Sequence, residues 1–201
     1  TTFFDPAIGA GIADLIQDNT KIVYLEAPGS QTFEMQDVPA IAKVAHAHGC
    51  IVMIDNTWAT GLFFKPFEHG CDVSIHAATK YIVGHSDAML GAITCTEATY
   101  GPIRETWGLL GLAVAPDDVY LATRGVRTMQ VRLEQHQKNA LEVATWLQSR
   151  PEVVRVLYPA LGNDPGHAIW KRDFTGASGL FGMILQPASE TQLAAFFDGL
   201  E

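Results

Sequence analysis

The sequence is poor in cysteine, in positive charge and in long hydrophobic runs. Its 201 residues include 3 cysteines (Cys50, Cys71 and Cys95) and no C-x-x-C pair. This argues against a disulfide framework or a cysteine zinc site and favours a reducing, cytoplasmic location. Lys and Arg number 13 against 22 Asp and Glu, a net charge of −9, so we expect neither nucleic acid nor membrane as a partner. No stretch is apolar over the roughly 18 residues that a membrane helix needs.

The length and the remaining composition are those of one folded domain, or of one domain and part of a second. Hydrophobic residues make up 48% of the chain and charged residues 17%, so burial of a core outweighs charge repulsion. Four short apolar runs predict buried strands, at 21–25, 50–54, 71–75 and 88–94. Asp37 and Pro39 open a helix that Gly49 ends. Near-continuous apolar strands separated by helices predict an α/β fold with a mostly parallel sheet.

The pattern changes after Gly125. Apolar residues recur at helical spacing from Arg127 to Gln148, which predicts one long amphipathic helix. Strands are expected at 153–158 and 179–185. We therefore place a domain boundary near Arg127, with 1–126 as part of a large domain and 127–201 as the start of a smaller α+β C-terminal domain.

Two strand ends carry candidate chemistry, because ligands of open α/β sheets bind beyond the carboxyl ends of the strands. Asp55 follows the second strand, where it either caps the next turn or presents a carboxylate that needs a positive partner. Lys80 follows the third strand, and is either a snorkelling surface residue or a desolvated amine suited to Schiff-base chemistry. The residues alone leave both pairs of alternatives open.

Read together, the two segments resemble a known family. The pattern from Asp72 through Ala-Ala-Thr79-Lys80-Tyr to Gly84-His-Ser86, with Asp55-Asn-Thr57 located 25 residues before the lysine (80 − 55), is similar to the lysine signature of the Cys/Met-metabolism family of pyridoxal 5'-phosphate (PLP) enzymes. Matches extend over most of the chain, through Glu26-Ala-Pro-Gly-Ser30, Thr123-Arg-Gly-Val-Arg-Thr128 and Trp170-Lys-Arg-Asp-Phe-Thr-Gly176. The resemblance implies the fold-type I, aspartate-aminotransferase-like architecture, with 1–126 in its PLP-binding domain.

The resemblance also implies site residues. Lys80 would bind PLP covalently and act as the catalytic base, and Asp55 would keep the pyridine nitrogen protonated through a charged hydrogen bond of about 1.5–3 kcal/mol. Thr57 would orient the ring, and Thr79 would donate its hydroxyl to the phosphate. No metal is implied. The chain resembles only the central portion of such an enzyme. The family's phosphate loop, ring-stacking Tyr and substrate-binding Arg therefore have no assigned counterpart.

Details of the motifs resemble the cystathionine β-lyase branch of these trans-sulfuration enzymes. Trp58 stands where γ-type members usually carry Phe, Ala77 where they carry Ser, and Ser30 where they carry Asn. The implied reaction is β-elimination from L-cystathionine, giving homocysteine, pyruvate and ammonia, with cystine or other S-substituted cysteines as further substrates. A γ-type lyase or synthase, or a catalytically incomplete fragment, are the alternatives. The family implies a homo-oligomer, usually a tetramer of two dimers.

The histidines favour structural roles. His46 and His48 are two apart at a helix end, so they point in different directions and are expected to interact with that helix terminus. His85 is expected to make local hydrogen bonds. His136 falls on the apolar stripe of the long helix, which predicts a hydrogen-bonded core histidine.

Overall fold

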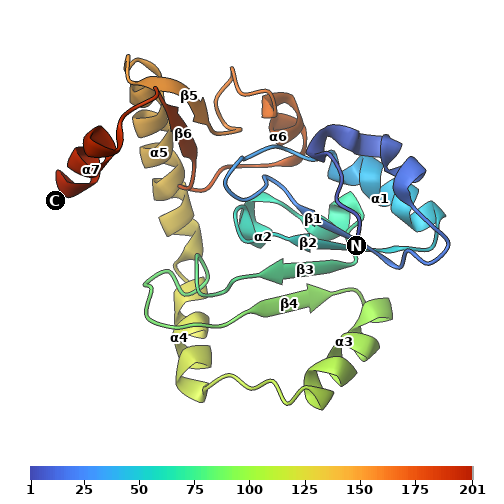
Figure 1. Cartoon of the computed structure of the whole chain (residues 1–201). Coiled ribbons are helices and arrows are strands. Elements are labelled where there is room, and N and C mark those ends of the chain that lie inside the picture. Colours follow the sequence, from blue (N-terminus) through green and yellow to red (C-terminus); the bar gives the residue numbers. More distant parts are fainter. Residues whose placement is uncertain (201) are drawn as a thin grey trace.

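The computed structural model describes residues 1–200 and is built around a four-stranded sheet in the order β1-β2-β3-β4 (Figure 1). The strands are β1 (Ile22–Glu26), β2 (Ile51–Asp55), β3 (Val73–His76) and β4 (Ala92–Cys95). The first three are parallel, and β4 is antiparallel to β3. The predicted α/β fold with a mostly parallel sheet is thus confirmed.

The fourth strand begins at Ala92, later than the predicted start at residue 88. The backbone N–H of Leu90 donates to Thr79 Oγ1 at 2.9 Å, and the Leu90 carbonyl accepts the Thr79 N–H at 3.1 Å. These bonds hold the preceding residues against the turn that follows β3. The apolar run therefore predicted too early a start for the strand, because its first residues bond to the turn and not to β3.

Helix α1 (Val38–Ala47) connects β1 to β2 and packs beside the 3-10 helix η1 (Pro6–Leu15). The carboxylate of Asp37 accepts the N–H of Ala40 at 3.2 Å, as expected for an N-cap. Gly49, with φ of +70°, ends the segment in the left-handed region that glycine tolerates best. The predicted helix face, including Val38 and Ile41, is fully buried.

The remaining elements follow in chain order. Short α2 (Thr60–Phe63) and η2 (Pro66–His69) lie between β2 and β3. Two helices, α3 (Glu97–Leu109) and α4 (Pro116–Val126), follow β4. The C-terminal part contains α5 (Met129–Gln148), β5 (Val153–Leu157), α6 (His167–Asp173), β6 (Gly182–Leu185) and α7 (Glu190–Asp198). Strands β5 and β6 form a separate antiparallel pair. No helix among the described residues combines the length and apolar character of a membrane span.

Strand β6 begins at Gly182, whereas the sequence predicted a start at Gly179. The carbonyl of Ser178 accepts the Tyr158 hydroxyl at 2.7 Å, and the carbonyl of Leu180 accepts the Trp58 indole N–H at 2.8 Å. The backbone of 178–180 is therefore bound to side chains from elsewhere in the chain, and this competes with strand pairing.

Aromatic side chains join the sheet region to the C-terminal elements. Trp58, which follows β2, meets Tyr158 and Phe174 edge-on, each with ring centroids 6.3 Å apart. Phe64 stacks on Phe174 at 4.5 Å. All of these rings are at most 8% exposed. The loop after β2 is thus fixed by residues from both parts of the chain, which sets the position of the candidate site.

Candidate active site

The carboxyl ends of β1, β2 and β3 lie side by side and point toward α5 (Figure 1). Glu26, Asp55 and Ile75 are in register across the three strands. Beyond the strands, the N–H of Asn56 donates to the Ile75 carbonyl, and the N–H of Ala77 donates to Thr57 Oγ1, both at 2.8 Å. The loop that carries Asp55 and the segment that leads to Lys80 are therefore tied together.

Asp55 is half-buried and holds its own loop. Its Oδ1 accepts the backbone N–H of Thr57 at 2.8 Å, which is the capping role that the sequence left open. No hydrogen bond from residues 1–200 reaches its other carboxylate oxygen, Oδ2. Both alternatives are therefore compatible in one residue, because one oxygen shapes the turn and the other is available to a ligand.

The charge of Asp55 acts on the neighbouring strands. Burial raises the pKa of Tyr24 on β1, and the nearby carboxylates of Asp55 and Glu26 raise it further. Burial lowers the pKa of His76 on β3, and the carboxylate of Asp55 opposes that effect. The Ser30 hydroxyl donates to Glu26 Oε1 at 2.5 Å. This edge of the sheet is thus negative, as a protonated ring nitrogen requires.

Lys80 lies at the surface of the described residues. It begins a tight turn in which its N–H donates to the Ala77 carbonyl at 2.9 Å and its carbonyl accepts the Gly84 N–H at 2.8 Å. Its side chain is exposed and forms no ion pair with residues 1–200. Among residues 1–200, Lys80 is therefore the surface amine of the two alternatives that the sequence left open. Its side chain is neither buried nor paired with a carboxylate.

The two threonines differ in what they leave free. Thr57 Oγ1 accepts the N–H of Ala77, so its own hydroxyl hydrogen has no partner among residues 1–200. Thr79 Oγ1 accepts the Leu90 N–H at 2.9 Å and donates to the Leu90 carbonyl at 3.2 Å. Donation from Thr79 to a phosphate therefore requires its hydroxyl to turn away from Leu90.

The polar groups of these two loops fit one side of a PLP ring. A free carboxylate oxygen on Asp55, a free hydroxyl on Thr57 and an unpaired amine on Lys80 come from two adjacent loops that hydrogen bonds join. These are an acceptor for a protonated nitrogen, a polar ring contact and an amine able to bond an aldehyde carbon. Asp55, Thr57 and Lys80 are therefore the residues that would hold the cofactor.

Two hollows lie near the sheet, and neither includes Asp55 or Lys80. One of about 790 Å³ lies between the N-terminal segment and β1, and one of about 350 Å³ is lined by Ser74, His76 and Ile82 among others. The lining of the first includes Glu26, the register partner of Asp55. Within residues 1–200, Asp55 is half-buried and Lys80 is exposed, so the candidate site is open to solvent on the Lys80 side.

The predictions for His48 and His85 are confirmed, whereas His46 bonds a carboxylate from another segment instead of the helix terminus and the prediction for His136 is wrong. His48 bonds the Val44 carbonyl of the last helical turn at 2.9 Å, and His85 bonds the Val83 carbonyl at 2.9 Å. His46 pairs with Asp72 at 2.9 Å. His136 is exposed, not part of the core, and meets Tyr81 edge-on at 5.8 Å. The apolar stripe of the helix predicted a core position for His136, but the turn after Lys80 covers the helix only partly there.

Sequence reasoning missed Tyr24, His76 and Leu90 as neighbours of the site. The first two lie on the strands either side of β2, close enough for the Asp55 charge to act on them, and Leu90 reaches Thr79 by a chain reversal. The alternation of β1 could have indicated Tyr24, since Glu26 lies two residues further along the same face. Nothing local to Leu90 signals its contact.

Comparisons with known proteins agree with this geometry. Cystathionine beta-lyase of Escherichia coli is 50% identical over 98% of this chain, and an L-alanine/L-glutamate racemase of Wolbachia pipientis is 45% identical over 92%. A crystal structure of cystathionine gamma synthase from Xanthomonas oryzae, in complex with aminoacrylate and cysteine, superimposes with a TM-score of 0.92 at 32% identity over 98% of this chain.

The chain spans about half the length of these proteins: 51% of the Escherichia coli enzyme, 45% of the racemase and 51% of the gamma synthase. The solved structures confirm the predicted fold-type I architecture, and the sequence profile of one family matches residues 1–201 without a gap at either end. The chain belongs to the Cys/Met metabolism PLP-dependent enzyme family.

Proposed function

We propose that this chain forms the cofactor-binding part of a carbon–sulfur β-lyase. The enzyme would cleave L-cystathionine to homocysteine, pyruvate and ammonia, with cystine or other S-substituted cysteines as further substrates. The observation that carries the proposal is the joining of the Asp55 loop to the Lys80 segment through the Ala77 N–H and Thr57 Oγ1. The 50% identity to a cystathionine beta-lyase supports the choice of reaction.

Each residue has a defined task in this reaction. PLP, when bound, supplies the electron sink that stabilises a carbanion at the substrate Cα. Asp55 Oδ2 would accept a hydrogen bond from the protonated ring nitrogen and so favour the charged form of that nitrogen. Thr57 fixes the ring through its free hydroxyl, and Thr79 would donate to the phosphate after turning from Leu90. The Lys80 amine would serve as the base that takes the substrate Cα proton, and loss of that proton would let the sulfur substituent on Cβ leave with its bonding electrons.

A second candidate is a γ-type enzyme of the same family. Its support is the close superposition on a cystathionine gamma synthase, with a TM-score of 0.92. Products separate the candidates, because β-elimination from cystathionine gives pyruvate and γ-elimination gives 2-oxobutyrate. D-Alanine formed from L-alanine would instead indicate racemisation, and no turnover at all would indicate an incomplete fragment.

The covalent assignment is tested by reducing the PLP-loaded full-length protein with borohydride and mapping the labelled peptide. We expect the label on Lys80, and we expect Lys80→Ala to lose both the label and turnover. The exposed Lys138→Ala, on α5, is the matched control and should retain both. A label on any other lysine would refute the assignment.

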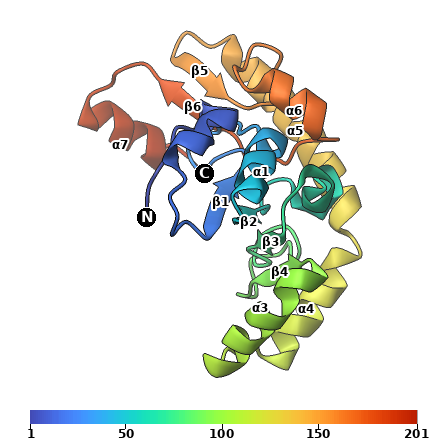
Figure 2. The same cartoon turned by 90° about the vertical axis from the view of Figure 1, so that its right-hand side faces the viewer.

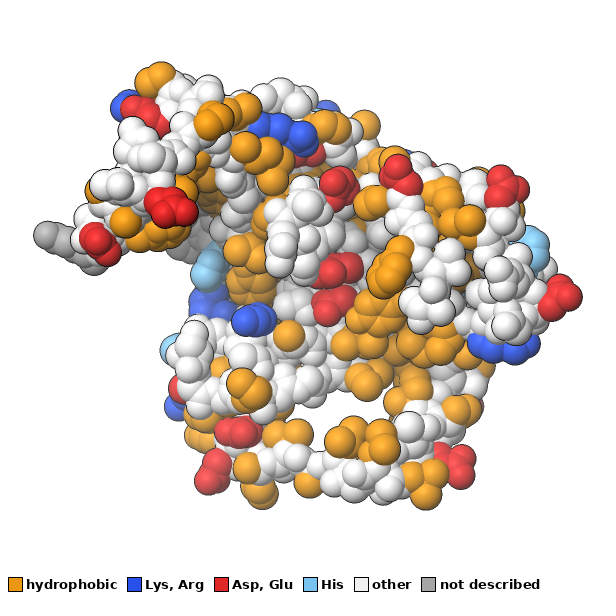
Figure 3. Space-filling model, in the orientation of Figure 1, with side chains coloured by type: hydrophobic (Ala, Val, Ile, Leu, Met, Phe, Trp, Pro, Cys, Tyr) orange, Lys and Arg blue, Asp and Glu red, His pale blue; other side chains and the backbone are white. Residues whose placement is uncertain are grey.

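We further infer a homo-oligomer, in which this chain contributes an apolar arm. The arm is the segment 107–120 at the junction of α3 and α4, which projects from the sheet (Figure 2). Leu109, Leu110 and Leu112 are 81%, 66% and 53% exposed. Figure 3 shows an opening between this arm and the sheet, bordered by hydrophobic side chains. A second copy filling it would bury apolar area that water otherwise contacts.

Two other inferences rest on sequence features. We propose that the chain divides near Arg127 into part of the PLP-binding domain, 1–126, and the start of the C-terminal domain, 127–201.

The proposed location is the cytoplasm. All three cysteines, Cys50, Cys71 and Cys95, are free thiols, which suits a reducing compartment.

A further inference from the structure

Two glycines let the α4–α5 junction approach the turn that carries Lys80. A Cβ on Gly125 would lie 2.3 Å from the Ile82 carbonyl oxygen and 2.5 Å from that of Val83. A Cβ on Gly84, which has φ of +80°, would lie 2.3 Å from Nη1 of Arg132. Any other residue at Gly125 would push the α4–α5 junction away from the turn, and any other residue at Gly84 would strain the backbone and displace the Arg132 guanidinium.

The guanidinium of Arg132 fills the space that Gly84 leaves, and the backbone carbonyls of Ile82 and Val83 fill the space beside Gly125. Its Nη2 donates to the Gly125 carbonyl at 2.8 Å and to the Ile82 carbonyl at 3.4 Å. Its Nε donates to Thr128 Oγ1 at 3.2 Å. The side chain thus bridges the last turn of α4, the first residues of α5 and the turn 80–84.

Nη1 of Arg132 is buried without a hydrogen-bond partner among the described residues, and burial lowers the pKa of the guanidinium. A buried unpaired donor costs free energy, and an apolar side chain of similar size would avoid that cost. The bonds to the two carbonyls therefore explain an arginine here better than the filling of space does.

The backbone that Arg132 holds is continuous with Lys80. The Gly84 N–H returns to the Lys80 carbonyl at 2.8 Å, and the N–H of Val83, a residue 1% exposed, donates to the Ala78 carbonyl at 2.9 Å. Next to Lys80, Tyr81 rests against His136, one helical turn after Arg132 on α5. The turn is therefore fixed on its helix side, while the lysine side chain remains free.

We propose that Arg132 is a positioning residue for Lys80, fixing the turn 80–84 so that the amine is held at the carboxyl end of β3. This inference rests on the proposed role of Lys80. In this proposal Arg132 acts through the turn, by its bonds to the Ile82 and Gly125 carbonyls.

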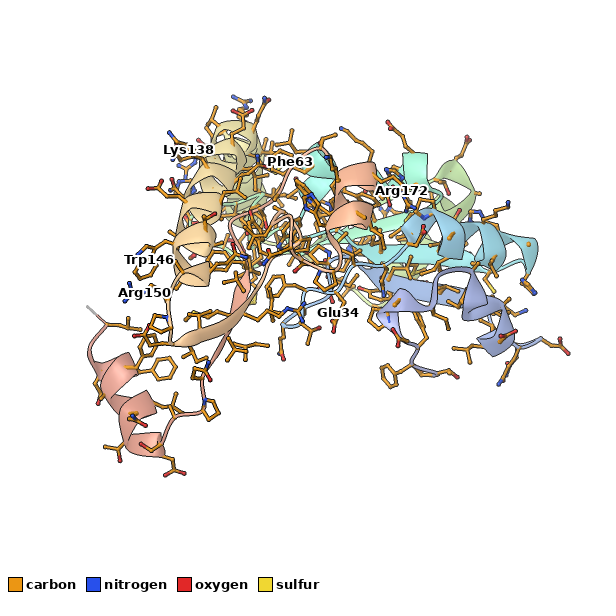
Figure 4. The ribbon with its side chains drawn as sticks, turned by 90° about the horizontal axis from the view of Figure 1, so that it is seen from above. Glu34, Phe63, Lys138, Trp146, Arg150 and Arg172 are labelled. Carbon is orange, nitrogen blue, oxygen red and sulfur yellow. The ribbon has the colours of Figure 1, made fainter. Side chains whose placement is uncertain are left out.

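The test uses the full-length protein and compares Arg132→Gln with Lys138→Gln, an exposed residue on the outer side of the same helix (Figure 4). In the cofactor-free protein, we expect hydrogen exchange in a peptide covering 78–86 to accelerate about tenfold or more in Arg132→Gln only. In the loaded protein, the pH midpoint of the lysine–cofactor absorbance band should shift, and kcat should fall about tenfold or more while KM changes less. Arg132→Lys, which keeps a charged donor, should lie between Arg132→Gln and the unmodified protein.

Unchanged exchange over 78–86 together with an unchanged absorbance midpoint in Arg132→Gln would overturn the proposal. Equal acceleration throughout the molecule would also overturn it, because that outcome means general destabilisation. If Arg132→Gln does not fold, the same two measurements on Arg132→Lys decide the question. Failure of borohydride to label Lys80 refutes the proposed function instead, and the exchange experiment still shows whether Arg132 holds the turn.

Discussion

At the scale of single residues, the site depends on how Asp55 divides its two carboxylate oxygens. Oδ1 shapes the loop by accepting the Thr57 N–H, and Oδ2 remains available. The loop needs only an acceptor, which an amide oxygen also supplies. The proposed chemistry needs the negative charge, because a neutral ring nitrogen stabilises a carbanion poorly.

Asp55→Asn separates the two roles. We expect the variant to fold and to bind PLP, since the amide oxygen still accepts the Thr57 N–H, and we expect kcat to fall by about 100-fold or more. Steady-state kinetics with cystathionine and the absorbance spectrum of the bound cofactor measure both effects. Asp14→Asn, at an exposed position, is the control. Near-normal turnover would reduce Asp55 to a turn cap.

Cys71 gives a second prediction at this scale. The side chain is 3% exposed, and burial, aided by the neighbouring Asp72 carboxylate, raises the thiol pKa to about 12. Because the thiolate is the reactive form, Cys71 should resist iodoacetamide at pH 8 in the folded protein and react after denaturation. Mass spectrometry of labelled peptides measures this. Rapid labelling of Cys71 under native conditions would contradict the burial.

At the scale of elements, one arginine joins α6 to the start of α1. Arg172 donates to both carboxylate oxygens of Asp37, at 2.8 and 3.1 Å, and also to Asp173 (Figure 4). Asp37 is also the N-cap of α1. The hydrogen bond from Arg172 holds the pKa of Asp37 below its ordinary value of 3.8. A C-terminal element therefore stabilises the helix that crosses from β1 to β2.

Asp37→Ala should lower the free energy of unfolding by about 1–2 kcal/mol, mostly through the lost N-cap. Asp37→Asn keeps a capping oxygen and removes the ionisation. Since the folded pKa is depressed, the charge stabilises the fold above pH 3.8 and that contribution is lost as pH falls through the folded pKa. Urea unfolding should therefore show Asp37→Asn converging with the unmodified protein as the pH falls below 3.8 and through the lowered pKa of Asp37.

The control for this series is Asp18→Asn, at an exposed position. It should follow the unmodified protein at every pH. A constant gap between Asp37→Asn and the unmodified protein down to the lowest pH would show that the Asp37 charge adds no stability.

At the scale of the whole molecule, surfaces remain open that related folds cover. Parallel sheets are usually buried on both faces, yet Ile22, Tyr24 and Ile93 are 48%, 50% and 54% exposed on this sheet. The leucines of the arm 107–120 are exposed as well. These surfaces, together with the exposed Lys80 side chain, suit the homo-oligomer that we propose.

The arm is the part of this surface that we assign to a second copy. In the full-length protein, Leu110→Asp should shift the oligomer to smaller species, because a carboxylate cannot be buried there without a partner. Sedimentation velocity measures the change. Val143→Asp, at a position 47% exposed on α5, should leave the oligomer intact. An unchanged oligomer in Leu110→Asp would exclude the arm as its interface.

The sequence alone indicated the six strands in order, the two helices α1 and α5, and the family, and it gave Asp55 and Lys80 as the proposed site pair. Each of these follows from local patterns, namely apolar runs, capping residues, and a motif that can be recognised from the spacing of its residues in the sequence. The parallel pairing of the first three strands then brings the two motifs to one edge.

Only the tertiary structure decided how those residues are held. The bond between Thr79 and Leu90, the flanking of Asp55 by Tyr24 and His76, and the exposure of His136 depend on which segments meet in space. Arg132 is the clearest case, since it reaches Ile82, which lies 50 residues earlier in the chain. Such contacts arise from the packing of distant elements, where local propensity contains no information about the partner.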